Sequence, residues 1–318
     1  MTSLTVVVPA TDGPPSLARC RAALDAAHDG PDQIVVVDAP PCLSASGARN
    51  LGAERARHDV VVFVDADVEV HPDAFSRIRA AFDAEPGLTA VFGAYDDTPA
   101  AAGRVSAFRN LLHHHVHHEG AGRAETFWTG LGAVRRDAFL AIGGFDDVRF
   151  PHPSVEDIEL GDRLCRGGAT IVLDPGIQGT HLKRWTLRTM VHTDFARRGV
   201  PWVALQVRNR RAARTLNLGW RHRLSALACV LTVVAGALRR PDVAALALGT
   251  FVVLNRAFYR LLTHRRGVVD AVLGVGLHGL HHLVGVAAVP VGILAALVHP
   301  SWRRALDGVE QTASSPYA

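Results

Sequence analysis

The first hundred residues alternate short apolar runs with longer segments of helical periodicity. The apolar runs are rich in valine and show little polar alternation, which indicates strands buried on both faces, as in a parallel sheet. We predict strands over residues 4–8, 33–38, 59–65 and 88–93. Helices are predicted between them over 16–28, 44–57 and 71–84, with Pro72 in the first turn of the last. This alternation of strand and helix predicts an α/β sandwich.

The pattern changes from about residue 102, where a helical stretch carries five histidines within residues 113–118. On a helix, His113 and His117 share one face, as do His114 and His118. No carboxylate or cysteine arrangement completes a metal site there, so we interpret the run as a polar helix face. Further on we predict a strand within 125–135 that glycines interrupt, helices over 137–142 and 156–166, and a strand over 169–173.

The last third of the chain is far more apolar. Residues 224–238 and 243–254 are each shorter than the roughly 20 residues that cross a bilayer, so we expect a tight helical hairpin there. Residues 277–298 are long enough to span alone, with a kink at Pro290, and 268–276 either begin that helix or lie along the interface. Three spans are favoured, with two crossings, a shallow hairpin or a buried soluble core as alternatives.

Charge and cysteine usage refine this picture. The net charge is +4, and eight arginines precede the apolar region: Arg197, Arg198, Arg208, Arg210, Arg211, Arg214, Arg221 and Arg223. The positive-inside rule places residues 208–223 and 256–266 in the cytoplasm. Nucleic-acid binding is the generic alternative for such a cluster, but no recognition motif accompanies it, so no nucleic-acid partner is expected.

From these patterns we predict four parts of the chain: an α/β domain over 1–202, a basic interfacial linker over 203–223, transmembrane or interfacial helices over 224–300, and a polar tail over 301–318. The N-terminus leads directly into a strand and has no signal-peptide pattern. The four cysteines form no C-x-x-C pair, which suits reduced thiols. We therefore expect a multi-pass protein of the cell membrane with its α/β domain in the cytoplasm.

Two aspartates close the third predicted strand, at the strand ends where α/β sheets bind ligands. Asp65 and Asp67 are two residues apart, so their side chains point the same way. A Mg²⁺ or Mn²⁺ ion takes few protein carboxylates and completes its shell with water and phosphate oxygens. Such a cation would hold a nucleotide diphosphate and neutralise the charge that develops when a sugar departs. A solvated loop is the alternative for an isolated pair of this kind.

Three features further along the chain add candidate site residues to Asp65 and Asp67. Asp157 opens a predicted helix with Glu156 and is either a partner of the helix dipole or a general base for an acceptor hydroxyl. His181 is either structural or a further metal ligand. Gly130, in the segment Thr129-Gly130-Leu131-Gly132, lets the backbone approach a sugar or forms an ordinary turn. The set indicates a metal-assisted transferase that uses an activated sugar.

In these residues the chain resembles the inverting, metal-dependent family 2 glycosyltransferases of the GT-A fold, here followed by a C-terminal membrane anchor. The resemblance covers roughly residues 4–202. It rests on the segments Val6-Val7-Val8-Pro9, 33–38, Ala48-Arg49-Asn50-Leu51-Gly52, 64–67, 128–138, Ile142-Gly143-Gly144-Phe145-Asp146, Glu156-Asp157, Arg163-Leu164 and His181.

By position, the resemblance implies the roles of the site residues. Donor binding falls to Pro9, Asp38, Arg49, Asp65 and Gly130, with Asp38 at the nucleotide base and Asp65 at the ribose or sugar. Asp67 and His181 bind the divalent cation, Asp157 is the catalytic base, and Glu156 and Trp185 contact the acceptor.

Two departures from the family pattern bear on substrates. Asp38 is followed by Ala39-Pro40-Pro41 rather than Asp, Gly and Ser, which leaves the nucleotide base open. Processive synthases carry Gln-x-x-Arg-Trp where this chain has His181-Leu182-Lys183-Arg184-Trp185, and we interpret the difference as transfer of a single sugar.

The resulting hypothesis is a membrane-anchored glycosyltransferase that moves one sugar, with inversion, from a nucleotide-diphosphate donor to a lipid-linked or membrane-associated acceptor. Two alternatives stay open. One is a sugar nucleotidyltransferase, although residues 9–15 lack the glycine-rich, arginine-containing loop of that class. The other is a non-catalytic membrane scaffold that binds nucleotide sugars.

Overall fold

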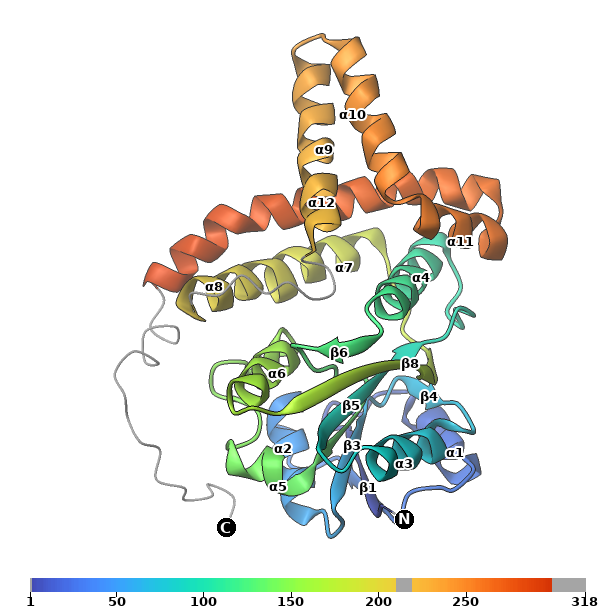
Figure 1. Cartoon of the computed structure of the whole chain (residues 1–318), viewed down its shortest axis with the longest axis vertical. Coiled ribbons are helices and arrows are strands. Elements are labelled where there is room, and N and C mark those ends of the chain that lie inside the picture. Colours follow the sequence, from blue (N-terminus) through green and yellow to red (C-terminus); the bar gives the residue numbers. More distant parts are fainter. Residues whose placement is uncertain (1, 210–218, 299–318) are drawn as a thin grey trace. The chain divides into compact units, whose positions relative to one another are not determined.

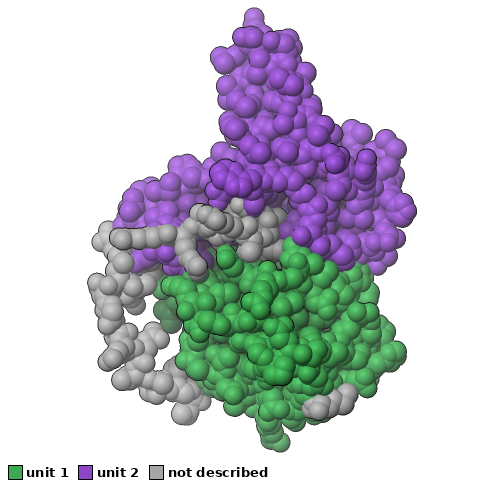
Figure 2. Space-filling view, viewed as in Figure 1, with its two compact units in different colours: residues 1–96, 120–183, 299–318 green, residues 97–119, 184–298 purple. Residues whose placement is uncertain are grey.

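The computed structural model describes residues 2–209 and 219–298. Within them the chain forms two compact units, shown in different colours in Figure 2. The α/β unit comprises residues 2–96 and 120–183, and the helical unit comprises 97–119 and 184–298. The four-part organisation stays a prediction. Its polar tail, and residues 210–218 of its linker with Arg210, Arg211 and Arg214, lie outside the described residues.

The described residues of the α/β unit contain one eight-stranded sheet, which is visible in the lower half of Figure 1. Its order is β2-β1-β3-β7-β5-β8-β4, and β6 pairs with β8. The strands are β1 Leu4–Pro9, β2 Gln33–Val37, β3 Val60–Val64, β4 Val68–Val70, β5 Leu88–Tyr95, β6 Gly122–Ala124, β7 Leu131–Arg135 and β8 Thr170–His181.

The sheet is mixed rather than parallel, which corrects the expectation from the apolar runs. Strand β1 runs parallel to β2 and β3, and β5 runs parallel to β8, but β7 lies antiparallel between β3 and β5. Every residue of β3 is fully buried, as expected. A central strand is covered on both faces whatever the direction of its neighbours, so burial alone does not reveal strand direction.

Five helices accompany the sheet in the α/β unit as described: α1 Leu17–Ala26, α2 Ala45–Arg55, α3 Ala74–Ala84, α5 Arg136–Ala141 and α6 Glu156–Arg166. All five occur where the periodicity predicts them, and α6 has the predicted bounds. The third begins at Ala74, three residues later than predicted, with Asp73 at its N-cap position. Pro72 therefore lies before the helix and not in its first turn.

Strand β8 differs most from the prediction. It does not end at residue 173 but continues through Pro175 and Gly179 to His181. A register shift against β5, between Phe92 and Ala94, accommodates this segment, and irregular pairing is where a strand tolerates proline. The three residues of β4, too short for the sequence pattern to reveal, pair with the end of β8.

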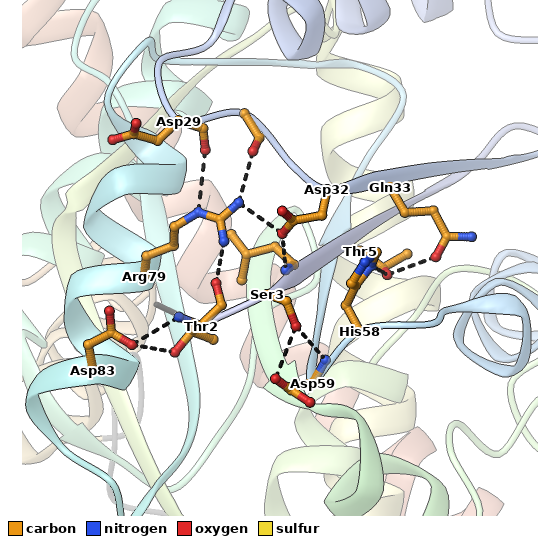
Figure 3. A network of polar contacts seen from close by, with 12 residues as sticks. Thr2, Ser3, Thr5, Asp29, Asp32, Gln33, His58, Asp59, Arg79 and Asp83 are labelled. Atoms are coloured by element: carbon orange, nitrogen blue, oxygen red, sulfur yellow. Dashed lines mark hydrogen bonds and ion pairs between the residues drawn. The ribbon is translucent and has the colours of Figure 1, made fainter.

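A polar network fixes the opposite end of the sheet, at the start of β1 (Figure 3). The Arg79 guanidinium of α3 donates hydrogen bonds to the carbonyls of Thr2, Asp29 and Gly30 and to the Asp32 carboxylate. Asp32 in turn accepts from the Leu4 N–H at 2.7 Å. This network connects α3 to the first strand. It lies at the end of the sheet opposite to the carboxyl ends of β1 and β3.

The helical unit begins with α4 Arg104–Glu119, which the chain enters after β5 and leaves before β6. The remaining helices described in this unit follow β8: α7 Leu187–His192, the π-helix η1 Thr193–Gly199, α8 Val200–Asn209, α9 Trp220–Ala237, α10 Pro241–Leu254, α11 Arg256–Arg266 and α12 Val268–Val298. Glycines allow close packing here, since a Cβ at Gly292 of α12 would lie 2.6 Å from the Val203 Cβ.

The apolar segments adopt the predicted hairpin, in which α9 and α10 lie side by side (Figure 1). Residues 268–276 begin α12, which runs unbroken through Pro290. By length and hydropathy, α12 alone among the described helices can cross a membrane, or two segments can if α10 and α11, bent by 71°, count as one. The described residues therefore offer one or two candidate spans rather than three.

Candidate functional site

The carboxyl end of β3 leads into a tight turn that presents both aspartates. The Asp65 N–H donates to the Gly130 carbonyl at 3.2 Å, and the Asp65 carbonyl accepts from Val68 at 2.9 Å. The Asp67 carbonyl accepts from the Leu182 N–H at 2.8 Å. The backbone of the turn is thus held by the residue just before β7 and the residue just after β8, while both carboxylates stay about 30% exposed.

Asp67 and His181 come together because β4 pairs with β8, with Val68 opposite His181. The Asp67 Oδ2 lies 3.5 Å from the His181 Nε2, and the imidazole is only 7% exposed. Burial acts to raise the pKa of Asp67, but the hydrogen bond and charge of His181, together with Lys183, lower it below the ordinary value.

The 3.5 Å separation of the Asp67 Oδ2 and the His181 Nε2 is close to the spacing of two ligands of one ion. Neighbouring ligand atoms of an octahedral Mg²⁺ lie about 3 Å apart, given metal–oxygen distances of about 2.1 Å. Among the described residues, no group of three His, Cys, Asp or Glu side chains is placed to hold a metal. Two protein ligands suit Mg²⁺ or Mn²⁺ that takes its other ligands from water and phosphate, whereas an all-protein cage would need more.

Arg49 of α2 connects the first aspartate to α6. Its guanidinium lies 2.6 Å from the Asp65 carboxylate and 3.4 Å from that of Glu156, and the side chains of Arg49 and Glu156 are both 5% exposed. Burial acts to lower the pKa of Arg49, but the carboxylates of Asp65, Glu156 and Asp157 together raise it. The second Glu156 oxygen accepts from the Ser154 N–H at 2.6 Å. The site therefore contains a buried salt bridge in which Arg49 connects Asp65 and Glu156, called the bridge below.

Asp157 lies in the first turn of α6, partly exposed, where its carboxylate accepts a hydrogen bond from the Ile158 N–H at 2.8 Å. This contact agrees with the helix-terminus alternative. Asp157 directly follows Glu156, and its charge contributes to the raised pKa of Arg49. The role of Asp157 as a base stays a prediction.

The other expected site residues are distributed as follows. Pro9 ends β1 opposite Val37 of β2, and Asp38 follows β2 with an exposed side chain, so both lie at carboxyl ends of strands. Trp185 belongs to the helical unit and is 8% exposed, with the Arg109 guanidinium 5.1 Å from its ring centroid. Roles of Pro9 and Asp38 in donor binding and of Trp185 in acceptor binding stay predictions.

Two residues of the quoted motifs hold a turn. The Asn50 side chain donates to the Phe145 carbonyl and accepts from the Phe145 N–H. Arg163 donates to the carbonyls of Ile142 and Gly144. Gly144 has φ +64°, and a Cβ there would lie 2.5 Å from the Asn50 amide oxygen, so glycine is required.

Two residues at the end of β5 also belong to this region, and the sequence pattern does not reveal them. Tyr95, its last residue, stacks on the His181 ring with centroids 4.1 Å apart. The next residue, Asp96, is buried and lies 3.1 Å from the His71 Nε2, and it accepts a hydrogen bond from the Thr180 hydroxyl. Ligands bind at the carboxyl ends of strands, a rule already applied to Asp65 and Asp67. The same rule, applied to β5, would have pointed to Tyr95 and Asp96.

The His71–Asp96 pair makes stability depend on pH. The hydrogen bond to Asp96 raises the pKa of His71 above its ordinary value, against the opposing effect of burial. The pair therefore stabilises the fold fully below the unfolded pKa of about 6.5, and this contribution is lost as the pH rises through the raised pKa. We expect His71→Gln to reduce the free energy of unfolding more at about pH 5.5 than at about pH 8.5. Denaturant unfolding at both pH values checks this, with the exposed His152→Gln as control; equal losses would contradict it.

The histidine run lies in α4, as expected. The rings of His113 and His117 lie 3.8 Å apart between centroids, and so do those of His114 and His118. The four cysteines are free, and burial, with the charges of Asp65, Asp67 and Glu69, raises the pKa of the Cys20 thiol to about 12.

Comparison with known proteins identifies the domain. Residues 16–143 match the family model for glycosyl transferase family 2, a segment that includes Asp38, Arg49, Asp65, Asp67 and Gly130. Together with the mixed sheet, this match shows that the chain contains a glycosyl transferase family 2 domain of the GT-A fold. The chain is therefore a glycosyltransferase that takes its sugar from a nucleotide sugar.

One solved structure supports the fold, and two further ones are similar to a lesser extent. The mannosyltransferase PcManGT from Pyrobaculum calidifontis, in complex with GDP-Man and Mn²⁺, is similar over 93% of this chain and 87% of its own, with 13% identity and a TM-score of 0.51. GalNAc-T7 with UDP, GalNAc and Mn²⁺ is similar over 58% of this chain and 44% of its own, with 13% identity and a TM-score of 0.42. A mycobacterial protein is similar over 65% and 74%, with 17% identity and a TM-score of 0.41. No curated protein matches the sequence significantly.

Proposed function

We propose that this chain transfers a single sugar, with inversion, from a nucleotide-diphosphate sugar to a lipid-linked or membrane-associated acceptor. The observation that carries the proposal is the approach of the Asp67 carboxylate to the His181 imidazole, 3.5 Å apart, at the carboxyl end of β3. A family 2 domain with a two-ligand cation site fits a diphosphate donor, because the phosphates complete the coordination shell.

A divalent cation, Mg²⁺ or Mn²⁺, would be held by Asp67 and His181. When bound, it would neutralise the charge that develops on the departing nucleotide diphosphate. The complex of PcManGT with GDP-Man and Mn²⁺ supports this assignment by its similar fold.

The donor would lie along the carboxyl ends of β1, β2 and β3, bound by Pro9, Asp38, Arg49, Asp65 and Gly130. Arg49 has a further role that its contacts suggest. Its guanidinium bonds one Asp65 oxygen at 2.6 Å, which orients the carboxylate and leaves its other oxygen for a ribose or sugar hydroxyl.

Asp157 would take the proton from an acceptor hydroxyl, with Glu156 beside it as an acceptor contact. We expect Asp157→Asn to lower kcat by about two or more orders of magnitude if the acceptor is a hydroxyl, the usual extent of general base catalysis. An acceptor phosphate is already ionised and would keep most of the rate. Initial rates with saturating donor measure the change. Asp162→Asn, on the same helix in an ion pair with Arg166, is the matched control and should keep its rate.

The helical unit would anchor the protein to the lipid bilayer of the cell membrane, as a multi-pass protein with its catalytic unit in the cytoplasm. Large apolar side chains are exposed along α9, α10 and α12. At the start of α9, Trp220 is 77% exposed and the Arg223 guanidinium lies 5.5 Å from its ring centroid. Tryptophan and arginine in this position are typical of a membrane interface.

One experiment tests donor and cation together. The full chain in detergent is screened by thermal shift against nucleotide sugars, with and without Mn²⁺, and the best donor is then incubated with a lipid extract. We expect stabilisation that needs both donor and Mn²⁺, followed by a glycosylated lipid whose anomeric configuration is inverted. Release of pyrophosphate from a nucleoside triphosphate, or donor binding without transfer to any extracted lipid, would contradict the proposal.

A further inference from the structure

We infer that Tyr95, Trp128 and Gly130 form an aromatic support that sets the orientation of the His181 ring for binding the cation. The inference rests on the proposed metal role of His181 and adds three positioning residues to it. Each contact in the support lies within the α/β unit.

The first contact is the stack of Tyr95 on His181. The two rings are nearly parallel, with an interplanar angle of 9° and centroids 4.1 Å apart. Tyr95 pairs with Gly179, and His181 lies two residues further along β8, so both side chains leave the same face of the sheet. Tyr95 is 8% exposed and belongs to the main core cluster, which makes it a fixed surface for the imidazole.

The contacts of His181 explain why a stack is needed. A metal-binding histidine usually donates its second ring N–H to a carboxylate or carbonyl, which fixes the plane of the ring. In the part of the chain that the structure describes, the polar contact of His181 is with Asp67, through Nε2, and its ring contact is with Tyr95. The flat face of Tyr95 thus takes the place of the usual hydrogen-bonded partner.

Trp128 holds Tyr95 in turn. Its ring meets Tyr95 edge to face, with centroids 4.9 Å apart at 89°. Gly130 makes room for that ring, because a Cβ at residue 130 would lie 2.2 Å from the Trp128 Cζ2. This overlap is with a rigid indole ring rather than a flexible chain end. The lack of a side chain at Gly130 therefore serves the aromatic support, whether or not the backbone there also contacts a sugar.

The test measures Mn²⁺ affinity directly, by electron paramagnetic resonance of free Mn²⁺, in the presence of GDP or UDP. We expect Tyr95→Leu and Gly130→Ala to weaken Mn²⁺ binding about tenfold, the lower range for loss of a residue that orients a metal ligand. Tyr95→Phe keeps the ring and should bind Mn²⁺ as the wild type does. Phe92→Leu is the matched control. Phe92 lies on β5, as Tyr95 does, and its ring contacts Phe127, so this change should leave the Mn²⁺ affinity unchanged.

A second measurement needs no metal. In protein labelled with ¹³C on its histidine rings, the face of Tyr95 should shift the His181 ring protons upfield, and this shift should vanish in Tyr95→Leu but persist in Tyr95→Phe. His181→Ala assigns the signal. Far-UV circular dichroism and melting confirm that each variant is folded at the temperature used.

The outcomes separate the two claims. Mn²⁺ binding that is lost in His181→Ala but unchanged in Tyr95→Leu overturns the aromatic support and leaves the metal site intact. A folded wild type that binds no Mn²⁺ with either nucleotide overturns the metal role, and the inference with it.

Discussion

Asp67→Ala is expected to lower kcat/KM by about a hundredfold or more, and His181→Ala to do nearly the same. The reason is electrostatic: each change removes one of two proposed protein ligands from the cation that stabilises the leaving diphosphate. Losing one well-placed stabilising group costs about 10²- to 10³-fold in rate. Transfer rates measured across a Mn²⁺ titration check the prediction, because a lost ligand also raises the Mn²⁺ concentration needed for half-maximal rate.

Two further variants test this explanation: the double variant Asp67→Ala/His181→Ala, and Glu69→Ala as a control. Because Asp67 and His181 act on one ion, the effects of the two changes should not add. Glu69→Ala alters β4 two residues away, at a partly exposed carboxylate paired with Arg19, and should leave the rate unchanged. Turnover that survives both EDTA and Asp67→Ala would remove the cation from the proposal.

Arg49→Met is expected to reduce the free energy of unfolding by roughly 3–5 kcal/mol, the usual cost of breaking a buried ion pair from one side. The change leaves Glu156, whose side chain is 5% exposed, without its cationic partner, and frees Asp65 from a 2.6 Å contact. Activity should fall as well, because Asp65 loses the group that orients it. Denaturant unfolding of the full chain in detergent measures the first effect and initial rates measure the second.

A second substitution distinguishes charge from packing. Glu156→Gln in the Arg49→Met background removes the stranded charge and should recover part of the lost stability. Arg79→Met serves as comparison, since that arginine is also buried but binds Asp32 and backbone carbonyls at the start of β1. It should lower stability yet leave the rate intact well below the melting temperature. No recovery in the double variant would show that the bridge is not held by charge.

Much of the α/β unit follows from local signals. Valine-rich runs and helical periodicity predict six strands and five helices, because a strand buried on both faces and a helix buried along one stripe differ in the spacing of their apolar residues. The position of Asp65 and Asp67 at the end of β3 follows from the same pattern, because the two residues directly follow its apolar run. Their partnership with distant groups does not: Glu156 is 107 residues from Arg49, and nothing local marks their ion pair.

What escaped prediction has physical causes. Strand β4 has three residues, fewer than any periodicity can reveal, yet it brings His181 to Asp67. The length of β8 was hidden by Pro175 and Gly179, which usually mark loops but here lie in an irregularly paired strand. The stack of Tyr95 on His181 depends on strand order, since β5 and β8 become neighbours only once the sheet is assembled.

The insertion of α4 between β5 and β6 limits how the enzyme can be shortened for study. Phe108, Leu111 and Leu112 of α4 are buried in a cluster with side chains of α11 and α12. A chain cut after Lys183 would remove those partners but keep α4, whose apolar face would then be open to water and prone to aggregate. A water-soluble form of the catalytic unit would have to replace residues 97–119 by a short link from β5 to β6, so solubility here requires an internal deletion as well as a C-terminal one.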